Sequence, residues 1–236
     1  MDIEITIERL FHALITGNRT EARQIMTETR EAGMTAEDAA HGLFWPVLEM
    51  ITQLYRADQL TTLAEHYATR LLRTLIDQAQ AEYEQKSHRG RKVLMFSGHS
   101  EADELAGQLV SDLVEADGYE VFFGGGGVAN DEILAEFGEH RPDVLLMFAS
   151  APSDAPNIRH LLDTIRNIGA NPQTQIVVGG GVFNRAEGLA EEIGADLWAK
   201  TPQELIGKLA EQADRRATSE QRTVGRTRRT TRSRVA

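Results

Sequence analysis

The spacing of apolar residues divides the chain into two regions with different periods. Up to about residue 85, apolar side chains recur at helical spacing, as over 7–14, 43–54 and 67–75, which is typical of helices with one buried face. Turns and helix starts are indicated at Gly17-Asn18, at Thr35-Ala36-Glu37-Asp38 and at Thr61-Thr62. The pattern predicts four helices with short connections, and therefore a small helical bundle over residues 1–85.

A polar, basic linker, residues 86–91, precedes a region in which short apolar runs alternate with amphipathic helices. Because such alternation produces parallel sheets, residues 92–214 are predicted to form a doubly wound, flavodoxin-like α/β domain with about five strands. The expected strands are 93–96, 121–123, 144–148, 176–178 and one near Leu197; the expected helices are 104–117, 131–140, 157–168, 186–193 and a last one opened by Thr201-Pro202-Gln203-Glu204.

Composition narrows the class of protein. The 236 residues carry a net charge of −11, are 41% hydrophobic and include no cysteine. This is typical of a globular chain in water, and it excludes disulfide frameworks, thiolate metal sites and cysteine nucleophiles. No run of about 18 apolar residues occurs, and Met1 to Glu4 lack the basic and apolar segments of a leader. We therefore expect a cytoplasmic protein that does not enter a membrane.

Charge is distributed unevenly along the chain. Residues 215–236 contain eight arginines against the single Glu220, a charge of +7 that leaves −18 for residues 1–214. With few large apolar residues, this segment is expected to be a disordered basic tail. Such a tail is either solvated or an arm that contacts nucleic acid or an acidic protein through its charge.

Ligands of doubly wound sheets bind beyond the carboxyl ends of the strands, so the loops there hold the candidate site. The unusual residues of these loops are His99, Ser100 and Asp103 after the first strand, Phe148 and Ser150 at the third, and Gly179, Gly180 and Gly181 at the fourth. Consecutive glycines let a flat group approach the backbone closely. Dinucleotide and Walker-type phosphate motifs, a Gly-x-Ser-x-Gly nucleophile and clustered carboxylates are all missing, which favours binding over catalysis.

The helical bundle predicted over residues 1–85, called the cap below, contains Tyr55, which is followed after nine residues by Glu65-His66. Together with the bundle and the five-stranded domain, this resembles the cobalamin-binding modules of methionine synthase, corrinoid methyl carriers and light-sensing cobalamin-dependent repressors over residues 1–213. The resemblance implies a cobalamin, as adenosylcobalamin, with the cap over its upper face and the α/β domain holding its lower face and nucleotide tail. It places Tyr55 over the upper ligand and Glu65-His66 beside the adenosyl group, with His66 as an upper-face candidate for cobalt. An amphipathic helix in which a buried His66 pairs with Glu65 is the alternative.

The sequence departs from that family pattern at several positions. Asp103 falls where the family has its cobalt-ligating histidine, and Phe148 replaces the first serine at the third strand, whereas the glycine run matches. His99, four residues before Asp103, is then the candidate lower ligand of cobalt, because carboxylates are poor ligands for cobalt in a corrin. Arg56 stands where the light-sensing repressors have a second cobalt-binding histidine.

The resemblance leaves three functions open. In the first, the chain is a cobalamin-binding sensor or regulator, responsive to light or to the upper ligand, that acts through a protein partner. In the second, it is a corrinoid methyl carrier for separate methyltransferases. In the third, it is an altered scaffold that binds another tetrapyrrole through His99 or His66, or binds no cofactor. Each function permits self-association as a homo-oligomer.

Overall fold

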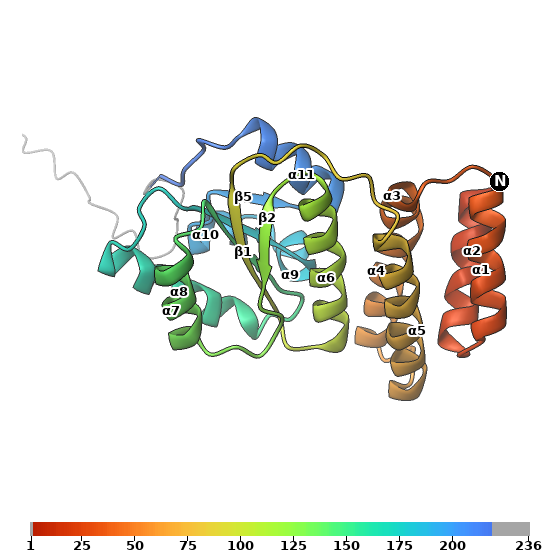
Figure 1. Ribbon diagram of the computed structural model, residues 1–236. Coiled ribbons are helices and arrows are strands. Elements are labelled where there is room, and N and C mark those ends of the chain that lie inside the picture. Colours follow the sequence, from red (N-terminus) through yellow and green to blue (C-terminus); the bar gives the residue numbers. More distant parts are fainter. Residues whose placement is uncertain (1, 219–236) are drawn as a thin grey trace, which may run out of the picture.

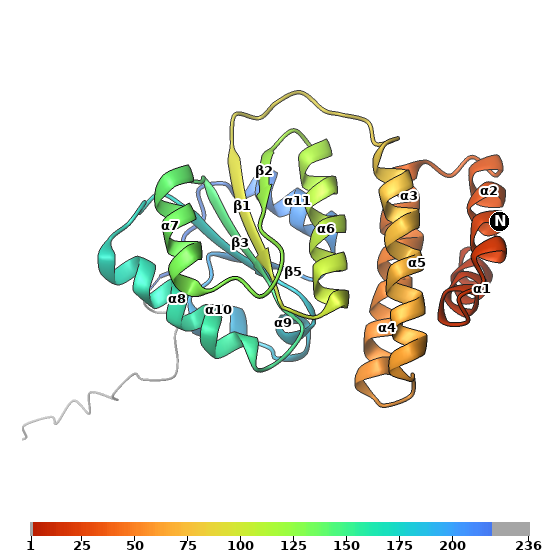
Figure 2. The same cartoon turned by 60° about the horizontal axis from the view of Figure 1, so that its bottom comes forward.

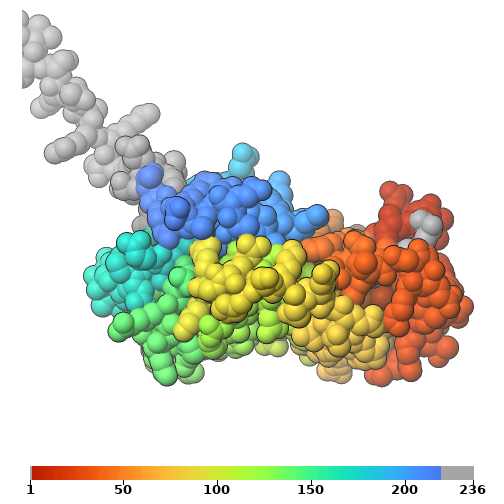
Figure 3. Space-filling model, turned by 45° about the horizontal axis from the view of Figure 1, so that its top comes forward, coloured from red at the N-terminus to blue at the C-terminus, as the bar shows by residue number. Residues whose placement is uncertain are grey.

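The computed structural model describes residues 2–218. The basic tail expected for residues 215–236 therefore lies almost wholly outside the described residues. A helical cap and an α/β domain lie side by side and give the molecule an elongated shape, with the cap red to orange and the α/β domain yellow to blue (Figures 1 and 3).

The cap contains the helices that the apolar spacing predicts. Asp2 begins the first helix by accepting a hydrogen bond from Glu4 N at 3.1 Å, and Thr35 forms a reciprocal capping box with Asp38. The helices are α1 (Ile3–Ile15), α2 (Arg19–Glu31), α3 (Ala36–Ala39), the π-helix η1 (Ala40–Phe44), α4 (Trp45–Arg56) and α5 (Thr62–Gln80). Helices α3, η1 and α4 follow one another without an interruption, and Pro46 lies at the junction of η1 and α4, where it donates no backbone hydrogen bond to the preceding turn.

The second domain contains one parallel sheet, as predicted. Its strands are β1 (Lys92–Ser97), β2 (Glu120–Phe123), β3 (Val144–Phe148), β4 (Gln175–Gly179) and β5 (Leu197–Ala199), in the order β2-β1-β3-β4-β5. After β1 the chain forms β2 at one edge of the sheet, and it then crosses back to form β3 on the other side of β1. The crevice between β1 and β3 is therefore the place where doubly wound sheets bind ligands. The expected fold class is confirmed.

Helices cover both faces of the sheet. They are α6 (Glu101–Ala116), α7 (Asn130–His140), α8 (Asp154–Ile168), α9 (Gly181–Arg185), α10 (Leu189–Ile193) and α11 (Pro202–Glu211). Val93 and Met95 of β1 pack with α6, α11 and the cap in one apolar core, whereas Leu94 and Phe96 pack with α7 and α8 in a second. Because the first core is continuous from α1 to α11, the cap is joined to the sheet by buried apolar contacts.

Two expected helix boundaries differ from the structure. Helix α6 begins at Glu101 because the Ser100 hydroxyl caps it, accepting a hydrogen bond from Asp103 N at 3.0 Å. Asp103 is therefore in the first turn of a helix. The helix expected at 186–193 is the shorter α10, which begins at Leu189 after Gly188 in the left-handed conformation, and a separate short helix, α9, precedes it at Gly181–Arg185. Over residues 2–218, each helix is too short or too polar to cross a membrane.

The linker between the domains crosses the end of the sheet opposite to the strand-end loops (Figure 2). Residues 81–91 contain no helix or strand, but their backbone is anchored, because Lys86 N and Arg89 N donate hydrogen bonds to Ala116 O and Gly118 O, both at 2.8 Å. Asp117, 3% exposed, accepts ion pairs from Lys86 at 2.6 Å and from Arg89 at 2.8 Å. The linker therefore holds a fixed path.

Candidate functional site

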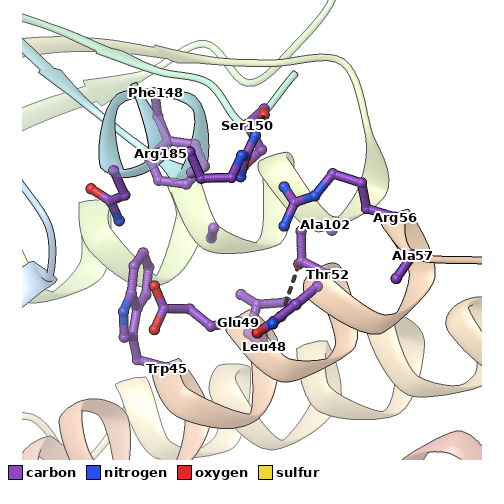
Figure 4. A pocket seen from close by; sticks show the side chains of 14 residues that line it. Trp45, Leu48, Glu49, Thr52, Arg56, Ala57, Ala102, Phe148, Ser150 and Arg185 are labelled. Carbon is purple, nitrogen blue, oxygen red and sulfur yellow. Dashed lines mark hydrogen bonds between the residues drawn. The ribbon is translucent and has the colours of Figure 1, made fainter. Parts of the chain in front are cut away.

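A cavity of about 530 Å³ lies between α4 of the cap and the carboxyl ends of the strands. On the side of the α/β domain it is bounded by the start of α6, the carboxyl end of β3 and helix α9 (Figure 4). The cap contributes Trp45, Leu48, Glu49, Thr52, Gln53, Arg56 and Ala57, and the α/β domain contributes Ala102, Ala106, Phe148, Ser150, Gly181, Asn184 and Arg185. Both domains thus form one site.

Helix α4 presents a single face to this cavity. Its lining residues from 45 to 56 are three or four positions apart, which is the spacing of one helix face. Trp45 at the start of that face packs edge-on against Phe148, with ring centroids 6.3 Å apart and an interplanar angle of 80°. Thr52 in the middle binds its own helix, with Oγ1 donating to Leu48 O at 2.8 Å (Figure 4). The cavity therefore has an aromatic end and a polar end.

Two guanidinium groups lie at the polar end. Arg56 reaches into the cavity from the end of α4, and Arg185 faces it from α9 (Figure 4). Arg185 Nη2 donates to Ser150 O at 2.5 Å, and a Cβ at Gly181 would lie 2.6 Å from Arg185 Nη1. Desolvation and the charge of Arg56 lower the pKa of Arg185, while the Asp103 carboxylate opposes them. The glycine at 181 thus makes room for a guanidinium.

Asp103 lies behind the wall of the cavity. It is 3% exposed, and its carboxylate faces Gly98, where a Cβ would lie 3.0 Å from Asp103 Cγ. Burial raises the pKa of Asp103, and hydrogen bonds from Ser150 and Ser100 oppose that shift. Helix α6 turns this side chain into the protein, so it does not face a ligand in the cavity.

His99 and Ser100 also lie outside the cavity lining. The His99 side chain is 73% exposed, with Nδ1 3.9 Å from Asp154 Oδ1, and it lines a second cavity of about 110 Å³ together with Gly98 and Gly125. Ser100 serves as the cap of α6. The structure thus does not bring the expected lower ligand of cobalt to the space under the cap.

The cap motif, which consists of Tyr55, Glu65 and His66, lies outside the cavity lining. The Tyr55 hydroxyl lies 3.5 Å from Thr62 Oγ1, between α4 and α5, and the ring is 39% exposed. Glu65 is buried, and its Oε2 lies 3.8 Å from His66 Nε2. Glu65, His66 and Glu101 of α6 bring one ligand atom each within 4.8 Å of one another. The motif therefore faces the start of α6, outside the residues that line the cavity.

The glycine run divides into three roles. Gly179 lies against Phe148, Gly180 has φ +103° and passes the Ala149 backbone too closely for any Cβ, and Gly181 lines the cavity. Gly179, Gly180 and Phe148 enclose a void of only about 20 Å³ beside β4 and β5. The space along the sheet is thus closed by Phe148, which occupies the position where a serine was expected.

Sequence reasoning did not single out Glu49, Asn184 and Arg185, and it noted Arg56 only as a departure from the family pattern. A signal for the α4 residues exists, because Trp45, Leu48, Glu49, Thr52 and Arg56 share one helix face. Arg185 gives no such signal, since a lone arginine after a glycine run is usually solvated.

Comparisons with known proteins agree with this architecture. Two family models described as B12 binding domains match residues 6–80 and 91–206. Monomethylamine corrinoid proteins 2 and 1 of Methanosarcina acetivorans are 21% and 20% identical over 202 and 206 residues, each match covering 84% of this chain and 92% of the relative. The structure of the Methanosarcina barkeri monomethylamine corrinoid protein superposes with a TM-score of 0.66 at 17% identity, covering 87% of this chain and 97% of the other.

Proposed function

Since this chain belongs to the B12-binding family, with a matching model in the cap and another in the α/β domain, we propose that it holds a corrinoid in the cavity under α4. One observation carries the proposal: the cavity lies between the two matched regions, bounded by α4 of the cap, by the carboxyl end of β3 and by helix α9, which follows β4. Leu48, Ala102 and Ala106 provide small or apolar walls against which a flat macrocycle can pack.

The donor groups of the cavity fit only part of a cobalamin site. Among the described residues, no imidazole lines the cavity, and the carboxylate at Glu49 is a poor ligand for cobalt in a corrin. The void beside Gly179 and Gly180, about 20 Å³, is too small for a nucleotide base. We therefore propose that the corrinoid binds without an axial ligand from this chain and without its tail inserted along the sheet.

We further propose that the chain is a corrinoid carrier for a separate methyltransferase. The support is the similarity to monomethylamine corrinoid proteins along nearly their whole length. A bound corrinoid supplies a cobalt ion that can carry a methyl group. The chain itself contributes the Trp45 and Phe148 rings, which exclude water from one end of the cavity, and a partner protein would approach the open end.

The other two functions have less support. A light or ligand sensor rests on Tyr55, Glu65 and His66 facing the upper ligand, and none of these lines the cavity. Binding of a different tetrapyrrole through His99 or His66 has less support for the same reason, because neither imidazole lines the cavity under α4. The carrier is thus the function that the site supports best.

Blocking the cavity tests the proposal. Thr52→Trp places an indole in its middle, while Thr27→Trp makes the same change on the exposed face of α2, where Thr27 Oγ1 binds Arg23 O as Thr52 Oγ1 binds Leu48 O. In absorbance titrations with hydroxocobalamin, we expect wild type and Thr27→Trp to bind alike and Thr52→Trp to bind at least about tenfold more weakly. Equal binding by all three would place the corrinoid elsewhere, and no binding by wild type would refute the function.

A further inference from the structure

The guanidinium groups of Arg56 and Arg185 share one end of the cavity but belong to different domains. Arg56 ends α4, and Arg185 ends α9, directly after the glycine run of β4 (Figure 4). Burial, and after it the charge of Arg56, lowers the pKa of Arg185. Like charges at one end of a cavity repel each other, so the arrangement without a ligand is unfavourable.

Neither guanidinium is neutralised by an acidic partner. The ion pairs among residues 2–218 include neither Arg56 nor Arg185. Two carboxylates are nearby. Glu49 points toward Trp45 at the other end of the cavity (Figure 4), and Asp103, whose charge acts on Arg185 without an ion pair, is buried with Ser100 and Ser150. The polar end of the cavity therefore has a local excess of positive charge, although the chain as a whole is at −11.

Arg185 is held ready for a ligand. Its Nη2 is fixed by the Ser150 carbonyl at 2.5 Å, and Gly181 leaves the space that Nη1 occupies. An arginine offers five N–H donors in a planar fork, and that fork matches the two oxygens of a carboxylate or phosphate. One donor used on a carbonyl leaves the others for a ligand.

We propose that this end of the cavity binds an oxyanion, a phosphate or carboxylate group, between Arg56 of the cap and Arg185 of the α/β domain. The anion offsets the repulsion between the two cations and ties the domains together. The inference uses the cavity of the proposed function but does not require that a corrinoid occupy it. The oxyanion is either the phosphodiester of a complete corrinoid or a separate small anion.

Titration calorimetry with inorganic phosphate tests the site itself. The variants are Arg56→Gln and Arg185→Gln, and Arg19→Gln, an exposed arginine at the start of α2, is the matched control. We expect each cavity variant to weaken phosphate binding about tenfold or more and the control to bind like wild type. Chloride at constant ionic strength keeps general screening equal in all samples. Phosphate affinities that are the same in wild type and both cavity variants would overturn the proposal.

Two corrinoids distinguish the sources of the anion. Hydroxocobalamin contains the nucleotide phosphodiester, and cobinamide lacks it. If that phosphodiester is the ligand, the two cavity variants weaken hydroxocobalamin binding about tenfold and leave cobinamide binding unchanged. If a separate anion is the ligand, both corrinoids keep their affinity while phosphate binding is lost. Loss of phosphate binding in the variants, in a protein that binds no corrinoid, would refute the proposed function and support the anion site.

Discussion

At the residue scale, Asp103 shows how one helix start changes the chemistry of a site. Ser100 caps α6 early, so residue 103 lies in the first helical turn with its carboxylate against Gly98. A cobalt-binding imidazole could not reach the cavity from this place without unwinding that turn. The structure thus places residue 103 on a helix, outside the residues that line the cavity.

The same geometry predicts the behaviour of the histidine in that loop. We expect His99→Ala to leave the absorbance spectrum of bound hydroxocobalamin unchanged, because the His99 imidazole lines a different cavity beside Asp154. His160→Ala, on α8, is the control for a surface imidazole. The measurement is a difference spectrum at saturating cofactor. A changed spectrum in His99→Ala alone would show that the loop rearranges and that this imidazole reaches cobalt.

Gly180 offers a test of the backbone path beside the cavity. Its φ of +103° and its close approach to Ala149 leave no room for a Cβ, so Gly180→Ala is expected to lower the free energy of unfolding by about 3 kcal/mol. Gly138→Ala, in α7 with no atom within 4 Å of the added Cβ, is expected to raise it by about 1 kcal/mol. Urea denaturation measures both. A neutral Gly180→Ala would mean that this turn relaxes easily.

Sequence reasoning identified which loops hold the site but only part of its residues. Phe148, Ser150 and Gly181 line the cavity because strand ends converge in any doubly wound sheet, and that rule depends on topology alone. The paths of Asp103 and His99 depend on which residue caps α6, a choice that local pattern did not resolve. Arg56 and Arg185 meet only through packing of the two domains, so no local signal could pair them.

At the element scale, the rotation of α5 about its axis explains why Glu65 and His66 lie outside the cavity. Helix α5 docks on α6 through polar contacts, with Gln108 accepting from Arg73 and donating to Asp77, both at 2.7 Å, and Thr69 donating to Glu101 at 3.2 Å. Helical spacing predicted that α5 has a buried face, but not which neighbour covers it. Helix α4 consequently lines the cavity.

The contact between α5 and α6 also contains a carboxyl group that titrates abnormally. Burial, together with the charges of Glu115 and Asp77, raises the pKa of Asp112 from 3.8 to about 6. Its Oδ2 is buried without a hydrogen-bond partner, as is the hydroxyl of Tyr83, whose pKa is raised by burial and by the Asp112 charge. Between about pH 3.8 and pH 6, folding is therefore accompanied by uptake of a proton by Asp112.

This titration makes stability depend on pH. The contribution of Asp112 to the free energy of unfolding is fully present below pH 3.8 and is lost as the pH rises through about 6. Asp112→Asn has no carboxyl group that ionises. The free energy of unfolding of this variant, relative to that of wild type, should therefore rise as the pH increases from 3.8 to about 6. Glu187→Gln, an exposed acid, is the control. Chemical denaturation at pH 5 and pH 7.5 measures the difference, and parallel curves for wild type and Asp112→Asn would contradict it.

At the scale of the whole molecule, the anchored linker sets how the two domains are held. Asp117 is 3% exposed and pairs with Lys86 and Arg89, so removal of its carboxylate takes the ion pair from both, while Arg89 Nε keeps its hydrogen bond to the carbonyl of residue 117 at 2.7 Å. We expect Asp117→Ala to speed tryptic cleavage in residues 86–91 several-fold and to lower the free energy of unfolding by about 2 kcal/mol. Asp131→Ala, in α7, is the control. Unchanged cleavage would show that backbone hydrogen bonds alone hold the linker.

The position of this linker has a mechanical consequence. It joins the domains at one end of the sheet, whereas the cavity opens at the other end (Figures 1 and 2). Helix α5, with 19 residues, runs about 28 Å between these two ends, so a tilt of about 10° at the linker displaces the far end of the cap by about 5 Å. For a given change in the angle between the domains, the end of the cap at the cavity therefore moves farther than the end anchored at Asp117, so the width of the cavity mouth is the dimension most sensitive to that angle.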